Sequence, residues 1–434
     1  MVTRANRGPG FAGRAGFGTT VPLGYARGVA VGSLIERALT PWAERVRREA
    51  NVPVRLCWGA DGASSVELGD APTVEVRVRD AAAWPLLIEP GLDTLAQAYV
   101  EGLVDVEGPL SDVVKVAHGL AASAQPAAGL LGRIRRSFHH TRENDSEAIQ
   151  YHYDVSDDFY AQWLDPAMVY SCAYFEHGDE TLAQAQEKKI DHILRKIRLQ
   201  PGQRLLDIGC GWGALVLRAA DQFGARCVGI TLSQNQFDLA TERVREAGLR
   251  DRIEIRLQDY RDVSDGPFDR ITSVGMFEHV GLDHLTDYFG RVRSLLEPDG
   301  WAMNHGITST DAYDGETRHG GGNFIQRYVF PRGELPHIGT VLRTLQEGDL
   351  EAIDVENLRR HYQRTTQLWS EAFEARAAVL RRLVDEKRWR IWRIYLAGCA
   401  WAFEHDEVAL FQVLCRPAGR SAQEQPWNRR WMYA

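Results

Sequence analysis

The sequence has no long apolar run, no paired cysteines and no excess of basic residues. No stretch approaches the roughly 20 apolar residues that span a bilayer as a helix. The formal net charge is −8, which argues against a nucleic-acid partner because phosphate binding needs a basic surface. The six cysteines contain no CxxC pair, so we predict neither a disulfide framework nor a metal site; they are Cys57, Cys172, Cys210, Cys227, Cys399 and Cys415. A reducing, cytoplasmic compartment fits this pattern.

The first third of the chain predicts a tail, a small domain and a linker. Residues 1–30 are rich in glycine and lack the apolar segment of a signal peptide, so we interpret them as a flexible tail. Residues 31–120 are predicted to form a small α+β domain that contacts lipid, a membrane or a second subunit. Alternating apolar and charged residues from Val74 indicate a strand, and helical spacing follows around Leu92. Residues 121–149 have the composition of a linker or mobile helix.

Residues 150–434 alternate strand and helix signals, which predicts βαβ units around a parallel sheet and a Rossmann-like α/β fold. Apolar segments predict six strands, which are "QRLLDIG" at 203, "ARCVGITLS" at 225, "IEIRLQD" at 253, "FDRITSVGM" at 268, "WAMNHGI" at 301 and "EVALFQVLC" at 407. Between the last two lies a long stretch, and we expect a lid at about 306–400 because long structureless loops are uncommon in compact domains.

A glycine-rich turn follows the first of these strands. Gly209, Gly211 and Gly213 stand between a strand and a helix, where doubly wound folds bind nucleotides, and they let the backbone approach a ligand closely. No Lys-Ser/Thr pair follows, so the turn is not a P-loop, and it also differs from the dinucleotide fingerprint. A tight turn without a ligand is the alternative. Asp207, just before the glycines, makes the pattern more informative.

The Asp-x-Gly-x-Gly-x-Gly pattern resembles motif I of class I S-adenosylmethionine-dependent methyltransferases. Thr231 stands where most of these enzymes carry an acidic residue, which points to a narrower family. Five separate motifs resemble the cyclopropane fatty acid synthases and their mycolic-acid-modifying relatives: "YSCAYFE" at 170, "GITLSQNQ" at 229, "VGMFEHVG" at 274, "NHGIT" at 304 and "RRHYQRTTQLW" at 359. The resemblance runs from about Tyr151 to Cys415. Residues 70–115 are similar to the small N-terminal domain of the phospholipid-acting members.

The resemblance implies two groups of site residues. A bicarbonate ion, acting as the base, would be held by Cys172, Glu278, His305, a backbone group of Ile307, and Tyr362; only the backbone of the cysteine need touch it. S-adenosylmethionine would be held by Tyr170, Ser171, Asp207, Gly209, Gly211, Gly213, Thr231, Leu232 and Gln236, with Gln258 and Asp259 near the adenine edge.

The chemistry gives a physical reason for such a site. Methyl transfer to an alkene carbon makes a carbocation, which needs a pocket poor in water. Closing a ring then removes a proton from the added methyl group, so a general base must lie within reach. Glu278 lies at the end of an apolar strand, where an unpaired charge is costly. Hydrogen bonds to an ion and a neighbouring donor would explain its presence there.

Each of these residues also has a structural interpretation. Glu278 could pair with an arginine of the lid, and Cys172 could be a small buried hydrophobe. A lone His305 would fit a satisfied core histidine, although the His-x-Ile spacing favours the ion. We interpret His279 as a structural histidine that fixes its loop.

A basic stretch near the end carries two tryptophans, Trp389 and Trp392, among six cations: Arg381, Arg382, Lys387, Arg388, Arg390 and Arg393. Such a helix can lie on an anionic membrane surface. A solvated face crossed by salt bridges is the alternative.

We therefore predict a cyclopropane-fatty-acyl-phospholipid synthase. It would transfer a methylene unit from S-adenosylmethionine to the cis double bond of unsaturated acyl chains in membrane phospholipids, and it would associate peripherally with the inner face of the membrane. A methyl- or methylene-branching enzyme is the nearest alternative, and a non-catalytic lipid-binding protein is a more distant one. The sequence leaves open the product, the head group, the double-bond position, whether the chain forms a homodimer, and the role of the N-terminal domain.

Overall fold

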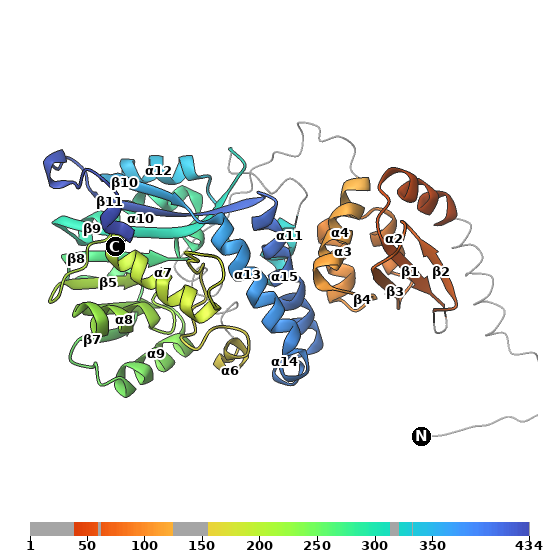
Figure 1. The fold of residues 1–434 in the computed structure, drawn as a ribbon, viewed down its shortest axis with the longest axis horizontal. Helices are drawn as coiled ribbons and strands as arrows, with labels where there is room; N and C mark the ends of the chain where they lie inside the picture. The colour runs from red at the N-terminus through yellow and green to blue at the C-terminus, as the bar shows by residue number, and fades with distance from the viewer. Residues whose placement is uncertain (1–38, 60–61, 125–154, 313–320, 332, 434) are drawn as a thin grey trace, which may run out of the picture.

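The computed structural model describes residues 39–59, 62–124, 155–312, 321–331 and 333–433, which form two domains (Figure 1). The predicted tail and most of the predicted linker lie outside the described residues.

The N-terminal domain packs helices, including one over residues 39–49, against a four-stranded sheet of order β2-β1-β3-β4. β1 runs parallel to β3, and the other pairs are antiparallel. The elements are β1 (Val54–Trp58), β2 (Ser64–Glu67), β3 (Val74–Val78), α2 (Ala83–Ile88), α3 (Leu92–Val100), β4 (Val104–Glu107) and α4 (Leu110–Ala124). The strand expected from Val74 and the helix expected around Leu92 are β3 and α3.

The second domain is built on a seven-stranded sheet of order β10-β11-β9-β8-β5-β6-β7, in which β5 to β9 are parallel and β11 runs against both neighbours. The central strands are apolar runs because helices cover both faces of the sheet. The strands are β5 (Arg204–Ile208), β6 (Arg226–Thr231), β7 (Ile253–Leu257), β8 (Phe268–Val274), β9 (Leu296–Ser309), β10 (Leu350–Asn357) and β11 (Val408–Pro417).

Helices cover this sheet and build a separate layer beside it. The helices that connect or follow the strands are α6 (Asp157–Ala161), α7 (Leu182–Lys196), α8 (Ala214–Phe223), α9 (Gln234–Glu246), α10 (Leu285–Leu295), α12 (Ile338–Glu347) and α16 (Arg430–Tyr433). The other layer contains α11 (Gly322–Tyr328), α13 (Arg359–Ala375), α14 (Ala377–Leu383) and α15 (Glu386–Glu404). Figure 1 shows α13 and α15 between the sheet and the N-terminal domain.

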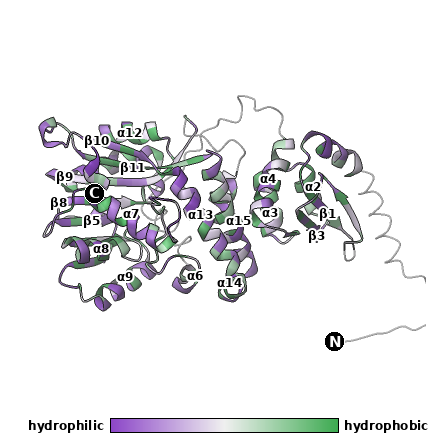
Figure 2. Ribbon diagram, viewed as in Figure 1, coloured by the Kyte–Doolittle hydropathy of each residue, from purple (hydrophilic) through white to green (hydrophobic). Residues whose placement is uncertain are grey.

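The expected lid at about 306–400 needs a correction, because part of that range belongs to the sheet. Strand β10 pairs with β11, and α12 packs against α10 and β10. Only α11 and α13 to α15 remain as the cover. Helices in both domains alternate hydrophilic and hydrophobic residues (Figure 2). Within the described ranges, no helix is both long and apolar enough to cross a membrane.

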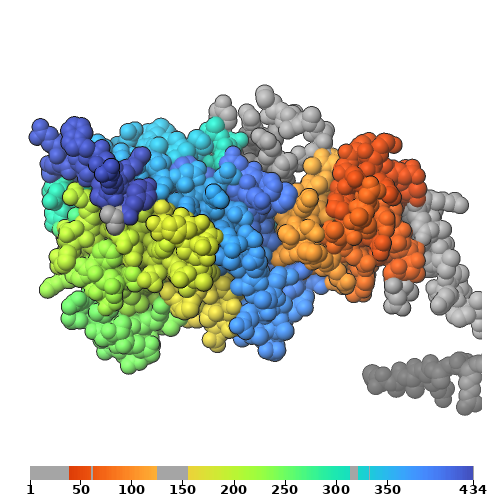
Figure 3. All heavy atoms as spheres, in the orientation of Figure 1, coloured from red at the N-terminus to blue at the C-terminus, as the bar shows by residue number. Residues whose placement is uncertain are grey.

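The two domains share a hydrophobic core. Phe324 of α11 and Ile391 of α15 belong to the same buried cluster as Leu56 and Val76 of the N-terminal sheet. Figure 3 shows the N-terminal domain seated against this helical layer. The apolar packing therefore extends across the domain boundary.

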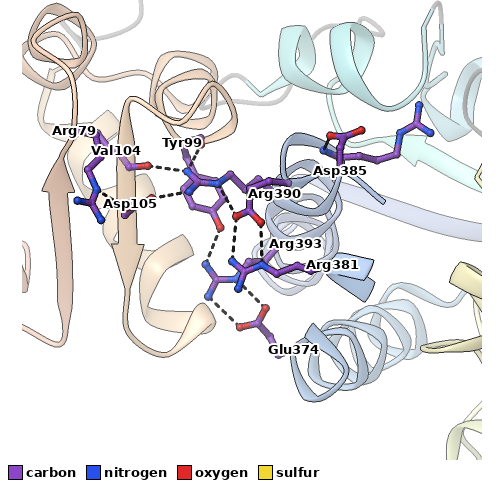
Figure 4. A network of polar contacts seen from close by, with 11 residues as sticks. Arg79, Tyr99, Val104, Asp105, Glu374, Arg381, Asp385, Arg390 and Arg393 are labelled. Atoms are coloured by element: carbon purple, nitrogen blue, oxygen red, sulfur yellow. Dashed lines mark hydrogen bonds and ion pairs between the residues drawn. The ribbon is translucent and has the colours of Figure 1, made fainter. Parts of the chain in front are cut away.

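A polar network also crosses the boundary (Figure 4). Arg390 donates to the carbonyl of Tyr99 at 2.9 Å and to Asp105 at 2.6 Å. Arg393 donates to the Tyr99 hydroxyl at 3.0 Å and pairs with Glu374 at 2.8 Å. Two arginines of α15 thus connect helix α3 and strand β4 to the helical layer.

The basic stretch matches the salt-bridged interpretation in part, because the exposed Arg381 and Lys387 pair with Glu386 and Glu101. Trp389 and Trp392 are each 4% exposed and pack in the core, so they do not face a membrane. Lys387 pairs with Glu101 of the N-terminal domain at 2.9 Å. Arg390 and Arg393 depart from a solvated face because they bond to Tyr99, Val104 and Asp105 of the other domain, which the local sequence does not reveal.

Candidate active site

A cavity of about 140 Å³ lies at the carboxyl ends of β5 and β6, where the glycine turn leads into α8. Gly209 and Gly211 have φ of 79° and 54°, a left-handed backbone that glycine adopts readily. A Cβ placed on Gly211 would meet no atom within 4 Å, so this backbone faces open space. The turn therefore lets a ligand approach the main chain directly.

Nine of the predicted cofactor residues line this cavity: Tyr170, Ser171, Asp207, Gly209, Gly211, Thr231, Leu232, Gln236 and Gln258. Two do not. A Cβ on Gly213 would lie 3.3 Å from that of Ala240, so this glycine allows α8 and α9 to pack closely. Asp259 caps a short helix and pairs with Arg261 at 2.7 Å.

The end of β6 holds Gln236 in a fixed orientation. The Thr231 hydroxyl donates to Gln236 Oε1 at 2.7 Å and accepts from the N–H of Ser233 at 3.1 Å. Because the amide oxygen is thus occupied, the amide nitrogen of Gln236 is turned the other way. Thr231 therefore contributes to the site by orienting the side chain of Gln236.

Sequence reasoning missed Lys189, a lysine of α7 that is 2% exposed and lines the same cavity. Its Nζ donates to Ser171 Oγ at 2.7 Å. Burial lowers the pKa of Lys189 to about 8, against the charge of Asp207 and other neighbours. Burial also raises the pKa of Asp207 to about 6, while a hydrogen bond from Thr272 at 2.7 Å opposes this. Lysines in amphipathic helices usually face water, so no local signal pointed to this one.

A second cavity, of about 450 Å³, adjoins the first and shares four lining residues with it: Tyr170, Ser171, Gly275 and His279. The structure brings all five predicted ion-site residues to this cavity, namely Cys172, Glu278, His305, Ile307 and Tyr362. They come from four places in the chain that only the fold brings together.

Glu278 lies in a short helix, Phe277–His279, just after β8, and is 7% exposed. Its Oε1 accepts from the N–H of Ile307 at 2.7 Å, and its Oε2 is buried with no hydrogen-bond partner among the described residues. Burial raises the pKa of Glu278 to about 7, although the bond from Ile307 lowers it. Within the described part of the chain Glu278 makes no ion pair, so the alternative of a lid arginine is not observed. The N–H of Ile307 is occupied by Glu278, which differs from the expected contact with an ion.

His305 and Gln412 face each other across β9 and β11. Gln412 Nε2 lies 3.3 Å from His305 Nδ1. An amide nitrogen only donates, so Nδ1 accepts and Nε2 carries the hydrogen. Burial holds the pKa of His305 well below its ordinary value, so the ring is neutral. Its Nε2 has no partner within the described ranges. Gln412 was missed because only the pairing of two distant strands places it there.

Cys172 and Tyr362 shape the site in different ways. The Cys172 thiol turns away to the carbonyl of Ala173 at 3.2 Å, and burial raises its pKa above the ordinary range. It is therefore a protonated, structural thiol. Tyr362 lies on α13 and packs on Phe403 with ring centroids 4.5 Å apart.

Gly306 lies between His305 and Ile307 and receives an aromatic ring. A Cβ at this position would lie 1.7 Å from a ring carbon of Phe277. The Phe277 ring therefore packs directly on the main chain of β9, one residue before Glu278.

The sheet order, the reversed β11 and the glycine turn at the edge of the parallel strands define a class I S-adenosylmethionine-dependent methyltransferase. A family model described as mycolic acid cyclopropane synthetase matches residues 140–413. The chain therefore belongs to this family, and both the predicted fold class and the predicted family are confirmed.

Two similar proteins named as fatty acid methyltransferases or tuberculostearic acid methyltransferases match most of the chain. A "Probable fatty acid methyltransferase" of Pseudomonas putida is 43% identical over 386 residues, covering 88% of this chain and 97% of the relative. "Tuberculostearic acid methyltransferase UfaA1" of Mycobacterium tuberculosis is 34% identical over 84% of this chain and 88% of its own length. The structure of mycolic acid cyclopropane synthase CmaA1, complexed with SAH and CTAB, has a TM-score of 0.59 and 36% identity, over 62% of this chain and 97% of that one.

Proposed function

We propose that the protein transfers a one-carbon unit from S-adenosylmethionine to the cis double bond of an unsaturated fatty acyl chain and closes it into a cyclopropane, with bicarbonate as the general base. One observation carries the proposal. Glu278 Oε2 and His305 Nε2 are both buried, both lack a partner among the described residues, and both belong to side chains that line one cavity. An acceptor and a donor of this kind fit a small ion that has both an O–H and oxygen acceptors.

The residues around this pair supply the conditions for the chemistry. The bound cofactor supplies an electrophilic methyl group on a sulfonium. Tyr170 and Ser171 line both cavities, so the cofactor side and the acyl side meet at these residues. Apolar side chains line most of the larger cavity and exclude the water that would trap a carbocation. Lys189, Asp207 and Gln236 fit the charged methionyl part of the cofactor.

The base would be held by the two unpartnered atoms. Ionised Glu278 would accept the O–H of bicarbonate, and the Nε2–H of His305 would donate to one of its oxygens. Since the N–H of Ile307 fixes Glu278 and Gln412 fixes the tautomer of His305, both groups are oriented before the ion binds. The ion would then remove a proton from the newly added methyl group.

A branching methyltransferase is the second candidate, and it is supported by the two long relatives, which are named as methyltransferases and not as cyclopropane synthases. Both reactions pass through the same carbocation and differ in which carbon loses a proton. A non-catalytic lipid-binding protein is less well supported, because it would have no need for the oriented pair of Glu278 and His305.

Product analysis separates these candidates. Purified protein would be incubated with methyl-labelled S-adenosylmethionine and vesicles of cis-monounsaturated phospholipid, with and without bicarbonate. Proton NMR of the released fatty acids distinguishes ring protons from a methylene branch. Label in ring protons that requires bicarbonate and is lost in Glu278→Gln supports the proposal. Label in a branch selects the second candidate, and no label in lipid with intact cofactor binding selects the third.

We also propose that the protein meets its phospholipid substrate at the inner membrane surface, because the acyl chains reside there. The experiment is sedimentation with vesicles of anionic and of neutral phospholipid. Binding to neither would contradict this part of the proposal, and sedimentation equilibrium without lipid tests for the homodimer.

A further inference from the structure

We propose that the N-terminal domain forms the far end of the acyl-binding cavity and thereby sets the length of acyl chain that the enzyme accepts. The inference rests on the proposed function, because the occupant is the acyl chain whose double bond reacts. It assigns the N-terminal domain a direct part in substrate selection.

The cavity that contains Glu278 and His305 continues into the interior of the N-terminal domain. Leu56 of β1 and Val76 of β3 are buried in that domain's core, and both line the cavity. Helices α3 and α4 contribute Leu95 and Val116. One continuous space therefore joins the ion-site residues to the sheet of the other domain.

The N-terminal part of the lining matches a hydrocarbon chain. Leucine, valine and alanine dominate it, and among the described residues of this domain that line the cavity the titratable ones are Tyr99 and His118. Polar ligands need convergent polar groups, which are concentrated at the other end around Glu278. The match to the family model begins at residue 140, so the common family sequence does not include this wall.

Helix α15 stands where the two halves of the cavity meet. Ile394, Tyr395, Gly398, Cys399 and Ala402 line the cavity from this helix. A Cβ on Gly398 would meet no atom within 4 Å, so the space beside it is open. Burial raises the pKa of the Cys399 thiol to about 12, although the residue keeps some accessible surface. The surface that Cys399 exposes therefore faces the cavity.

The polar network of Figure 4 holds this wall in place. Tyr99 lines the cavity, and its hydroxyl accepts a hydrogen bond from Arg393 at 3.0 Å. Arg390 fixes the adjacent carbonyl of Val104 at 3.0 Å. Because the wall is tied to α15 by arginines that are largely buried, its distance from the ion site is fixed, as a length limit requires.

The test narrows the passage and measures chain-length preference. Gly398→Leu places a side chain in the open space, and leucine is compatible with the helix. Substrates are vesicle phospholipids whose acyl chains of fourteen, sixteen and eighteen carbons carry a cis double bond at the same carbon from the carboxyl end. We expect the ratio of kcat/KM for the longest over the shortest chain to fall on the order of tenfold. Ala96→Leu, from α3 within the N-terminal domain, should change the ratio in the same direction.

Gly290→Leu is the matched control, because Gly290 is also a glycine within a helix with open space beside it, and it lines neither cavity. It should leave the ratio unchanged. The inference is overturned if the ratio of kcat/KM for the longest over the shortest chain is unchanged in both Gly398→Leu and Ala96→Leu. It is also overturned if these variants lose kcat/KM equally for all three chain lengths.

Binding of saturated fatty acids of the same three lengths, measured by calorimetry, separates this inference from the reaction. Length-dependent loss of binding in the variants, with no labelled lipid from the wild type, supports the cavity assignment and overturns the proposed reaction. If fatty-acid binding is independent of chain length in every variant and the wild type forms labelled lipid, the cavity assignment alone is overturned.

Discussion

The backbone N–H of Ile307 donates a 2.7 Å hydrogen bond to Oε1 of Glu278. A residue near the end of β9 thus orients the carboxylate that lies just after the neighbouring strand, β8. One oxygen is fixed by this bond, and the other is presented to the cavity without a described partner. The carboxyl group has a pKa of about 7, which places its change of charge near neutral pH.

Glu278→Gln should stabilise the protein more at high pH than at low pH. The folded-state pKa of about 7 exceeds the ordinary value of 4.5, so between these values the folded state binds more protons and wild-type stability falls as pH rises. The glutamine does not titrate. We expect the variant's gain in unfolding free energy, without cofactor or bicarbonate, to be about 2 kcal/mol larger at pH 8 than at pH 5.5.

Glu180→Gln provides the control for this measurement. Burial raises the pKa of Glu180, but hydrogen bonds from Lys188 and backbone N–H groups outweigh it and lower the pKa to about 2. Its stabilising contribution is present above pH 4.5 and lost only as pH falls towards 2. Denaturant unfolding should therefore show a constant difference from wild type between pH 5.5 and 8. A flat difference for Glu278→Gln would contradict the buried carboxylate.

Gln412 should act as a positioning residue for His305. Gln412→Leu removes the donor to Nδ1, and Gln412→Glu supplies an acceptor that moves the hydrogen from Nε2 to Nδ1. Activity should therefore be highest in the wild type, lower in Gln412→Leu and lowest in Gln412→Glu, with a loss of about tenfold or more in Gln412→Glu. Gln412→Glu should also need a higher bicarbonate concentration to reach its half-maximal rate. The ¹⁵N shifts of His305 report the tautomer, and an unchanged tautomer in Gln412→Glu would exclude this role.

Lys189 should bind the carboxylate end of the cofactor. Its pKa of about 8 means that it is charged below that pH and loses its charge above it. The affinity of the wild type for S-adenosylhomocysteine should therefore fall between pH 7.5 and 9, while Lys189→Met should bind about tenfold more weakly at pH 7 and change little with pH, consistent with one lost charged hydrogen bond. Calorimetry measures both. Equal affinities at pH 7 would show that Lys189 serves only Ser171.

Arg390 should stabilise the junction of the two domains. Its side chain is 14% exposed and bonds to Asp105 and to two backbone carbonyls, so Arg390→Leu removes three contacts and leaves Asp105 paired with Arg79 alone. We expect the free energy of unfolding to fall by about 2 kcal/mol and the backbone amides of α3 and β4 to exchange hydrogen faster. Arg381→Leu is the control, because Arg381 is 48% exposed and pairs with Glu386 at the surface. Equal effects of the two changes would contradict a special role for the junction.

Local patterns in the sequence predicted the parts of the fold that local forces determine. The apolar strand, glycine turn and helix around Asp207 could be read directly, and so could the late strand that became β11. Strand β10 could not, because Glu351, Asp354 and Glu356 interrupt its apolar pattern and its partner lies far along the chain.

The site residues also divide into those that local sequence reveals and those that only the tertiary structure reveals. Motifs indicated Glu278 and His305, but the contacts that orient them depend on tertiary structure. Gln412 reaches His305 only because β11 runs against β9, and Lys189 enters the cofactor cavity only because it lies on the buried side of α7. Arg390 and Arg393 of α15 looked like part of a surface face because Asp105 and Tyr99, which they contact, belong to the other domain.

The Phe277 ring that rests on Gly306 has a consequence for sequence variation. Even one methyl group at position 306 would displace the ring and, with it, the carboxylate on the next residue. A natural or engineered variant with any side chain there would thus lose the ion site while every residue predicted to touch the ion was still present. When homologous sequences are screened for activity, a glycine between the histidine and the isoleucine is as informative as the residues predicted to bind the ion.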